Sequence, residues 1–281
     1  MKGLLAGGLA ATAGAGLAYG WFEAGWLRTR ILPLRLERLP PELEGLRVAH
    51  LSDFHLGLPS RGRVATEGAV DWVAERRPDL VCLTGDLVAR RSGEPLLREL
   101  LGRLGPSFAV LGNHDHGLSR DPFSQPVDLH SLPGARLLLN ETATVELRGR
   151  RVQVAGVDPR LYSAGRARAA ALADPDADLR ILLCHFPGIA RKLPPGTFDL
   201  VLAGHMHAGQ IVLPYPGGRL LLAHPRARES AGVYRFGATA LHVSPGLGTT
   251  FVPFRYFARP EVTELVLTAA EERADFVAQS N

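Results

Sequence analysis

Apolar and polar positions alternate in two rhythms along the first half of the chain. Short apolar runs, which suit buried strands, are separated by longer segments whose apolar residues recur every three or four positions, as in amphipathic helices. The predicted strands lie at 47–52, 79–84 and 108–111, and the predicted helices at 64–77 and 95–104. This βαβαβ order predicts an α/β fold, with a sheet covered by helices on its faces.

The second half of the chain is richer in strands. Strands are predicted at 135–139, 143–147, 152–157, 179–184 and 200–203, with a helix at 167–173. Four more strands, at 219–223, 233–236, 239–243 and 262–267, are separated by turns rich in glycine and proline that leave no room for long helices. We expect these four to be mostly antiparallel and to complete a second sheet.

The N-terminal segment has no charged residue from position 3 to position 22. About 20 such residues in a helix would cross the hydrocarbon core of a bilayer. Trp21 and Trp26 follow at the position of an interfacial aromatic belt. We therefore expect an N-terminal transmembrane helix within residues 1–27. A cleaved signal peptide and a soluble helix are the alternatives, because the segment is rich in glycine and alanine.

This expectation sets the predicted domain organisation and location. Residues 1–27 form the anchor, 28–45 a linker that contains three prolines, 46–268 the catalytic domain and 269–281 a polar tail. The protein is then a single-pass protein of the cell membrane. Lys2 precedes the apolar segment and several arginines follow it, which favours a catalytic domain on the cytoplasmic face.

Charge and cysteine content change this picture little. The formal net charge is +4, and no run of basic residues with interleaved aromatic residues is present, so we expect no nucleic-acid partner. Cys82 and Cys184 both lie in apolar runs and are expected to be buried thiols in the core. The oligomeric state leaves no signal in the sequence.

Residues that can bind metals or transfer protons follow five of the predicted strands. They are Asp53 and His55, then Asp86, then Asn113, His114 and Asp115, then His185, and finally His205 and His207. The carboxyl ends of strands are where α/β folds place their sites. Imidazole, carboxylate and amide oxygen ligands together suit divalent Mn, Fe, Zn or Co. Two such ions need a shared ligand, and a carboxylate from a central strand can bridge them.

The five motifs D-x-H, G-D, G-N-H-D, H and G-H-x-H, in this order between residues 50 and 207, resemble the calcineurin-like metallophosphoesterase superfamily. The resemblance implies a four-layer α/β/β/α sandwich of two mixed sheets flanked by helices, and two divalent metal ions. It implies that Asp53, His55 and His207 bind one ion, that Asn113, His185 and His205 bind the other, and that Asp86 bridges them. His114 would act on the leaving group, and Asp115 would orient His114.

The segments 209–211, 213–214, 244–248, 253–255 and 259–261 resemble a bacterial membrane-associated subgroup of YkuE- and YaeI-like phosphodiesterases. Met206 and Ala208 depart from the subgroup pattern G-H-T-H-G-G-Q, but neither is at a ligand position. His116 and Arg255 are candidate substrate-binding residues, the latter because its guanidinium can grip a phosphate. Four aromatic residues at 251–257 form either core packing or a rim that meets lipid.

The resemblance and the N-terminal segment together predict the activity. We expect a dinuclear metallophosphoesterase that hydrolyses phosphodiester or pyrophosphate bonds in a lipid-linked or nucleotide-linked substrate. A related branch acts on UDP-2,3-diacylglucosamine in lipid A synthesis. The alternatives are a general cell-surface phosphomonoesterase and a non-catalytic metal-binding scaffold.

Overall fold

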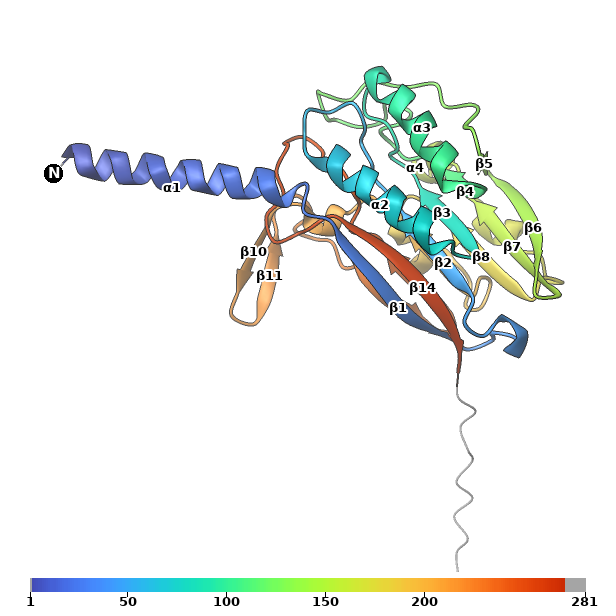
Figure 1. Ribbon diagram of the computed structural model, residues 1–281. Coiled ribbons are helices and arrows are strands. Elements are labelled where there is room, and N and C mark those ends of the chain that lie inside the picture. Colours follow the sequence, from blue (N-terminus) through green and yellow to red (C-terminus); the bar gives the residue numbers. More distant parts are fainter. Residues whose placement is uncertain (1, 271–281) are drawn as a thin grey trace, which may run out of the picture.

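The computed structural model describes residues 2–270, and for residues 2–10 it describes the backbone only. Two six-stranded sheets face each other, and all α-helices except the N-terminal one lie on their outer sides (Figure 1). The α-helices are α1 (Lys2–Glu23), α2 (Gly62–Arg76), α3 (Glu94–Leu104) and α4 (Pro159–Ser163). This arrangement confirms the predicted α/β class with two mixed sheets.

The first sheet has the strand order β1-β14-β2-β3-β4-β5. Its strands are β1 (Arg28–Leu36), β14 (Glu261–Ala269), β2 (Arg47–Leu51), β3 (Leu80–Thr84), β4 (Ser107–Val110) and β5 (Ala135–Leu137). Strands β2 to β5 are parallel; α2 connects β2 to β3, and α3 connects β3 to β4. Strand β14 is antiparallel to β2, so the sheet is mixed.

The second sheet has the strand order β12-β13-β9-β8-β7-β6. Its strands are β12 (Gly232–Phe236), β13 (Thr239–Val243), β9 (Leu200–Ala203), β8 (Leu179–Leu183), β7 (Arg150–Gly156) and β6 (Glu141–Leu147). The four central strands are parallel, and both edges are antiparallel. The carboxyl ends of β8 and β9 therefore lie at one edge of this sheet.

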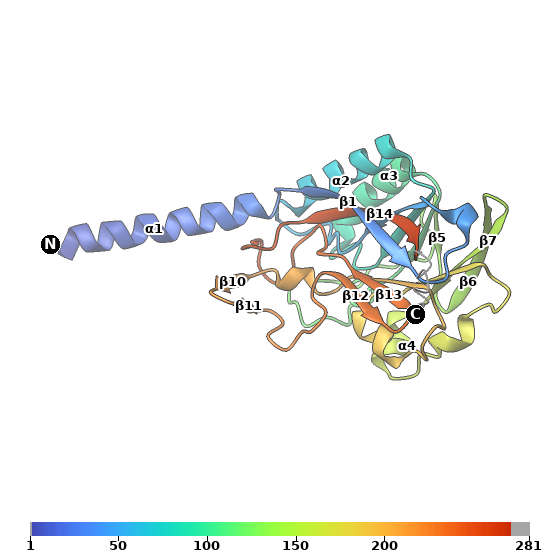
Figure 2. The same ribbon diagram turned by 90° about the horizontal axis from the view of Figure 1, so that it is seen from below.

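Three apolar layers hold the sandwich together. Between the sheets, Val48 and Cys82 of the first sheet pack with Ile181 and Leu200 of the second. The outer face of the first sheet is covered by α2 and α3, and that of the second by α4 and short 3-10 turns (Figure 2). The helix expected at 167–173 is one of these turns, Ala169–Leu172. Both cysteines are free and buried, as predicted.

The C-terminal third differs from the prediction that its four strands are mostly antiparallel and complete the second sheet. Strand β14 joins the first sheet, not the second. The strand expected at 219–223 is β11 (Gly218–Leu221), which pairs only with β10 (Val212–Tyr215) in a separate hairpin. Strand β13 is parallel to β9. The local pattern identified these strands but contained no information on their partners, because pairing depends on distant segments.

The predicted linker at 28–45 is largely part of the fold. Residues 28–36 form the edge strand β1, which pairs with β14 along its whole length. Leu34 and Leu36 are buried in the core between the sheets. A short 3-10 turn at Pro41–Leu43 buries Leu43. Pro33 did not prevent a strand, because an edge position tolerates a missing N–H donor.

Truncation tests this boundary. A chain that starts at Arg28 should fold, whereas a chain that starts at Leu46 should lose several kcal/mol of stability, because burying one Leu side chain contributes about 1.5–3 kcal/mol. Urea unfolding of the two truncated proteins gives the comparison. Equal midpoints and slopes would show that β1 adds nothing to the domain.

Helix α1 extends away from the body, and only its last turns contact it (Figures 1 and 2). The Glu23 carboxylate is buried and accepts hydrogen bonds from the backbone N–H groups of Phe257 and Ala258. Among residues 2–270, no helix has both the length and the apolar character needed to cross a membrane. The transmembrane helix expected within residues 1–27 is therefore not supported, because glycine and alanine add little hydrophobicity per residue.

The boundaries of the predicted tail are only partly described. Residue 269 is the last of β14, which extends the folded domain by one residue beyond 268. The rest of the predicted tail, from 271 to 281, lies outside the described residues.

Candidate active site

The site lies where the central parallel strands of both sheets end. Asp53 follows β2 and Asp86 follows β3, while His185 follows β8 and His205 follows β9. The two sheets face each other, so these four strand ends bring their side chains to the same edge of the sandwich. All seven predicted metal-binding residues are placed there, as the strand-end argument expected.

The backbone at the site is unusual. Asp53, His55, Asp86, His205 and His207 all have a positive φ, between 47° and 73°. Such a backbone is uncommon for residues other than glycine, and it costs energy that the surrounding structure must supply. It turns the chain sharply at the end of each strand.

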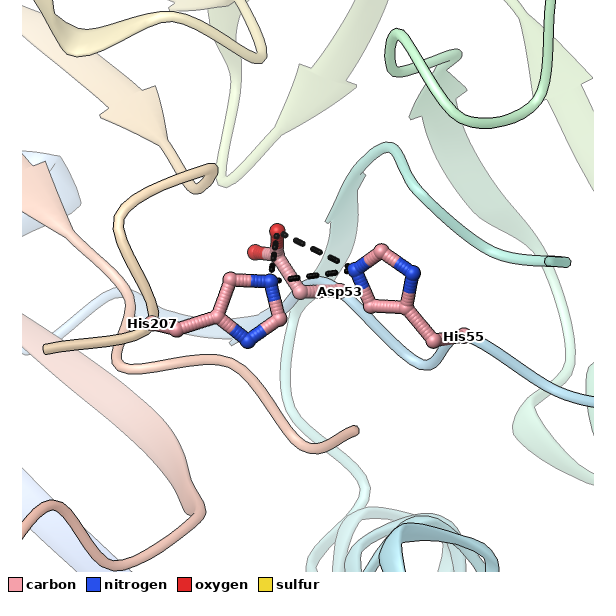
Figure 3. A group of neighbouring side chains, drawn as sticks. All are labelled: Asp53, His55 and His207. Carbon is pink, nitrogen blue, oxygen red and sulfur yellow. Dashed lines mark hydrogen bonds and ion pairs between the residues drawn. The ribbon is translucent and has the colours of Figure 1, made fainter. Parts of the chain in front are cut away.

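One set of side chains consists of Asp53, His55 and His207, which point toward one another (Figure 3). The Nε2 atoms of the two histidines are 3.0 Å apart, and Nε2 of His207 is 3.3 Å from Oδ1 of Asp53. All three residues are buried. The Asp53 carboxylate also accepts a hydrogen bond from the backbone N–H of His205, which fixes its orientation.

A second set consists of Asp86, His185, His205 and Asn113. Nε2 of His185 is 3.1 Å from Nδ1 of His205 and 3.1 Å from Oδ1 of Asn113. Its other ring nitrogen, Nδ1, donates to the carbonyl oxygen of Thr84 at 2.7 Å. That hydrogen bond leaves Nε2 free to bind a metal, since a histidine ligand usually donates its second N–H in this way.

The Asp86 carboxylate lies between the two sets. Its Oδ2 atom is 3.2 Å from Nε2 of His185 and 3.6 Å from Nε2 of His55. Its Oδ1 atom accepts the backbone N–H of His114 at 2.8 Å. Asp86 is thus the residue that faces both sets.

The donors fit divalent metal ions. Three overlapping groups of histidine and carboxylate donors have their ligand atoms within 4.8 Å of one another. Nitrogen atoms of neighbouring imidazoles point at each other, which is unfavourable unless a proton or a cation lies between them. Nitrogen and carboxylate donors together suit a transition metal such as Mn, Fe, Zn or Co.

The pKa values of these groups reflect the crowding of charge. Burial alone would raise the pKa of Asp86, but His185 and His114 hold it well below its usual range. Burial alone would lower the pKa of His185, but the Asp86 carboxylate raises it to about 9. Burial and the neighbouring His185 lower the pKa of His205 to about 3. A cation between these groups would replace the proton that His185 otherwise carries.

Two glycines of the motifs allow this packing. A methyl group added to Gly112 would overlap the Asp86 carboxylate, and one added to Gly204 would overlap Ser52 and the Asp53 carboxylate. Both glycines are therefore needed because the ligands pass too close to the backbone for any side chain.

The hydrogen bond expected between Asp115 and His114 does not form. The Asp115 carboxylate instead accepts backbone N–H groups of Val88 and Gly112, at 3.0 and 2.8 Å, and so ties two loops together. Burial and the neighbouring Asp86 charge raise the pKa of Asp115 to about 7. Nδ1 of His114 contacts Oγ of Ser124 at 2.6 Å. The expected role of Asp115 is corrected, and Ser124 takes the position beside His114.

Ser124 should therefore act as a positioning residue for His114. Ser124→Ala should lower kcat for a diester about tenfold and shift the pH–rate profile, because the imidazole loses the partner that fixes its ring. Ser119→Ala is a matched control on the same loop, since its Oγ contacts only a backbone N–H, that of Asp121. An unchanged pH–rate profile for Ser124→Ala would contradict the positioning role.

The Arg255 side chain is not available to a substrate. It is fully buried, and its guanidinium donates to the carbonyl oxygens of Gly248, Pro245 and Ala258. Its Nη2 also lies 3.3 Å from Nδ1 of His207. The expected phosphate clamp is wrong, because the structure uses the guanidinium to hold the loop beside His207.

Two further histidines, His116 and His224, remain to be placed. The sequence predicted a role for His116 but not for His224. His116 is half-buried, and its Nε2 has no hydrogen-bond partner among the described residues, so its substrate-binding role stays a prediction. The ring of His224 is 5.8 Å from that of His205. The sequence offered no signal for His224, because it follows the β10–β11 hairpin and not a central strand.

Comparison with known proteins agrees with this geometry. The family model described as calcineurin-like phosphoesterase matches residues 46–209, more than half of the chain. The Bacillus subtilis metallophosphoesterase YkuE is 30% identical over 95% of this chain and 94% of that protein. The Escherichia coli phosphodiesterase YaeI is 27% identical over 88% of this chain and 89% of that protein. A Danio rerio transmembrane protein with a metallophosphoesterase domain is 36% identical over 84% of this chain and 56% of that protein.

The fold, the site and the relatives identify the class of protein as a metal-binding phosphoester hydrolase. The chain belongs to the calcineurin-like metallophosphoesterase family.

Proposed function

We propose that this chain is a two-metal hydrolase that cleaves phosphodiester or pyrophosphate bonds in a lipid-linked or nucleotide-linked substrate at a membrane surface. The observation that carries the two-metal part is the position of Asp86, whose Oδ2 atom faces both His55 and His185. One carboxylate between two sets of ligands is the arrangement that two close cations require. Bound ions would neutralise phosphoryl oxygens and make a water more acidic.

We propose that His114 supplies the proton that the leaving group needs and that Ser124 orients the His114 ring. His114 lies beside Asp86, with its Nε2 atom 4.0 Å from Oδ2 of that carboxylate. Because Ser124 contacts Nδ1, Nε2 is the ring nitrogen on the side of the Asp86 carboxylate. We propose that it contacts the scissile phosphoryl group and donates a proton to the leaving oxygen. Burial lowers the pKa of His114, which makes its protonated form a stronger acid.

Exposed apolar side chains at one end of the molecule support a membrane location. Large apolar side chains that are each 40% exposed or more gather there: Leu17, Tyr19, Trp21, Phe22, Trp26, Leu213, Tyr215, Leu220 and Phe257. They lie on α1 and just after it, on the β10–β11 hairpin (Figure 1), and on the segment between β13 and β14, where the Phe257 ring contacts Tyr19 and its carbonyl accepts a hydrogen bond from Arg219. Apolar patches of this kind mark membrane or protein interaction sites.

We propose that this end adsorbs to the cytoplasmic face of the cell membrane. Helix α1 has no charged residue between Lys2 and Glu23, so it would contact the membrane with its apolar side chains. Arg30 lies a few residues after α1, and the anionic cytoplasmic leaflet attracts such basic residues, whereas Arg28 is paired with Glu261. This location supports a lipid-linked phosphate, of which a UDP-2,3-diacylglucosamine-type molecule is one candidate.

Metal analysis and two substrates test the chemistry. The full-length protein should contain two divalent ions and should hydrolyse bis-p-nitrophenyl phosphate faster than p-nitrophenyl phosphate. A faster reaction with the monoester would instead support a general phosphomonoesterase. Protein that binds metal but hydrolyses neither ester would be a non-catalytic scaffold.

Vesicles test the location. Flotation with anionic phosphatidylglycerol vesicles should retain the full-length protein, and Phe257→Asp should reduce the bound fraction. Val233→Asp on the edge strand β12 is the control, because Val233 is also exposed but lies on another element. Equal binding of the wild-type protein and both variants would contradict a role for the apolar end.

A further inference from the structure

A hollow opens beside His205, and none of the other six proposed ligands lines it. Its volume is about 340 Å³, and His205 forms part of its wall. The residues that matter for its chemistry are Tyr162, Phe186, Arg191, Arg226, Arg228 and Glu229. None of these was singled out by a motif, since they come from α4, from the turn after β8 and from the segment between β11 and β12.

The hollow carries positive charge that is not neutralised. Arg191 forms an ion pair with Glu229, so these two charges cancel. Within residues 2–270, no carboxylate pairs with Arg226 or Arg228, and both side chains are exposed. The hollow therefore offers two free guanidinium groups to a ligand that carries negative charge.

The walls keep these arginines close to the catalytic edge. The ring of Phe186 packs against His205, with ring centroids 4.7 Å apart, and Tyr162 stacks on Phe186 at 4.6 Å. The segment that carries the two arginines begins at His224, whose ring is 5.8 Å from that of His205. A turn closed by the hydrogen bond from Ala227 N–H to the His224 carbonyl holds this segment.

We propose that this hollow binds the second, non-reacting phosphoryl group of a pyrophosphate-linked substrate. The inference rests on the proposed function, because the scissile phosphoryl group would bind at the metal site to which His205 would contribute a ligand. In a pyrophosphate, the second phosphorus is only one bridging oxygen away, within reach of a hollow that shares His205. Guanidinium groups match phosphate oxygens in charge and in geometry.

The size of the hollow agrees with this substrate class. A simple diester would leave both guanidinium groups without a partner. A volume of about 340 Å³ is larger than a phosphoryl group, so it leaves room for the first atoms of the group attached to it. The inference thus selects pyrophosphate bonds over simple phosphodiesters.

Kinetics with two substrates test the inference. The double variant Arg226→Ala/Arg228→Ala should raise KM for a nucleoside diphosphate sugar at least tenfold. It should change KM for bis-p-nitrophenyl phosphate by no more than about twofold, because that diester has no second phosphoryl group. Arg166→Ala/Arg168→Ala is the matched control, since these arginines line a different hollow. Equal effects on both substrates, or equal effects of the two double variants, would overturn the inference.

Binding separates this inference from the proposed activity. The full-length chain, freed of metal with a chelator and checked for folding by circular dichroism, is titrated with inorganic pyrophosphate and with inorganic phosphate. Calorimetry should show tighter binding of pyrophosphate, and the Arg226→Ala/Arg228→Ala variant should lose that preference. A wild-type protein without hydrolytic activity that keeps this preference would disprove the proposed function alone. Loss of the preference in the Arg166→Ala/Arg168→Ala control would disprove the inference alone.

Discussion

Replacing Asp86 with alanine should abolish ester hydrolysis and remove at least one metal ion per chain. Its carboxylate is the only one among the described residues placed between both sets of ligands. Without it, two cations at close range repel each other with nothing between them. We expect kcat for bis-p-nitrophenyl phosphate to fall by at least about 10³-fold, since a whole metal ion is lost.

Metal analysis by mass spectrometry and the rate assay check this result together. Asp128→Ala is the control, because Asp128 is an exposed carboxylate that pairs only with His130. Circular dichroism should confirm that the variant is folded, since Asp86 also accepts the His114 N–H. A folded Asp86→Ala protein with two ions per chain and a normal rate would disprove the bridging role.

Replacing His114 with alanine should leave metal binding intact but slow the hydrolysis of diesters with poor leaving groups. General acid catalysis contributes about 10²–10⁴-fold, and an alkoxide needs the proton most. Nitrophenolate departs without a proton, so the loss should be much smaller with bis-p-nitrophenyl phosphate. Rates with an alkyl diester and with the nitrophenyl diester, measured on the same preparation, give the two factors.

The control for His114 is His130→Ala, whose imidazole is 87% exposed and lies outside the site. If His114→Ala loses the same factor on both leaving groups, the residue binds the phosphoryl group instead of donating a proton. If it loses metal, the group formed by His55, Asp86 and His114 is itself a metal site.

The amino-acid sequence determined most of the secondary structure and the identity of the site. Strands β2, β3 and β9 were predicted within one residue of their bounds, because each is a short apolar run. Position after a strand marked nine candidate residues, and the family resemblance divided them into seven proposed ligands and the pair His114 and Asp115. Parallel strands meet at one edge, so a local pattern was enough to bring these side chains together.

Tertiary structure decided the features that depend on distant partners. Residues 28–36 became a strand because residues 261–269 lie beside them, and no local pattern records that pairing. Arg255 was expected at the substrate but is enclosed by carbonyl groups of its own loop. Ser124, ten residues further along the chain, lies beside His114 where Asp115 was expected. Hydrogen bonds of buried polar groups depend on which backbone atoms lie nearby, and only the folded chain determines that.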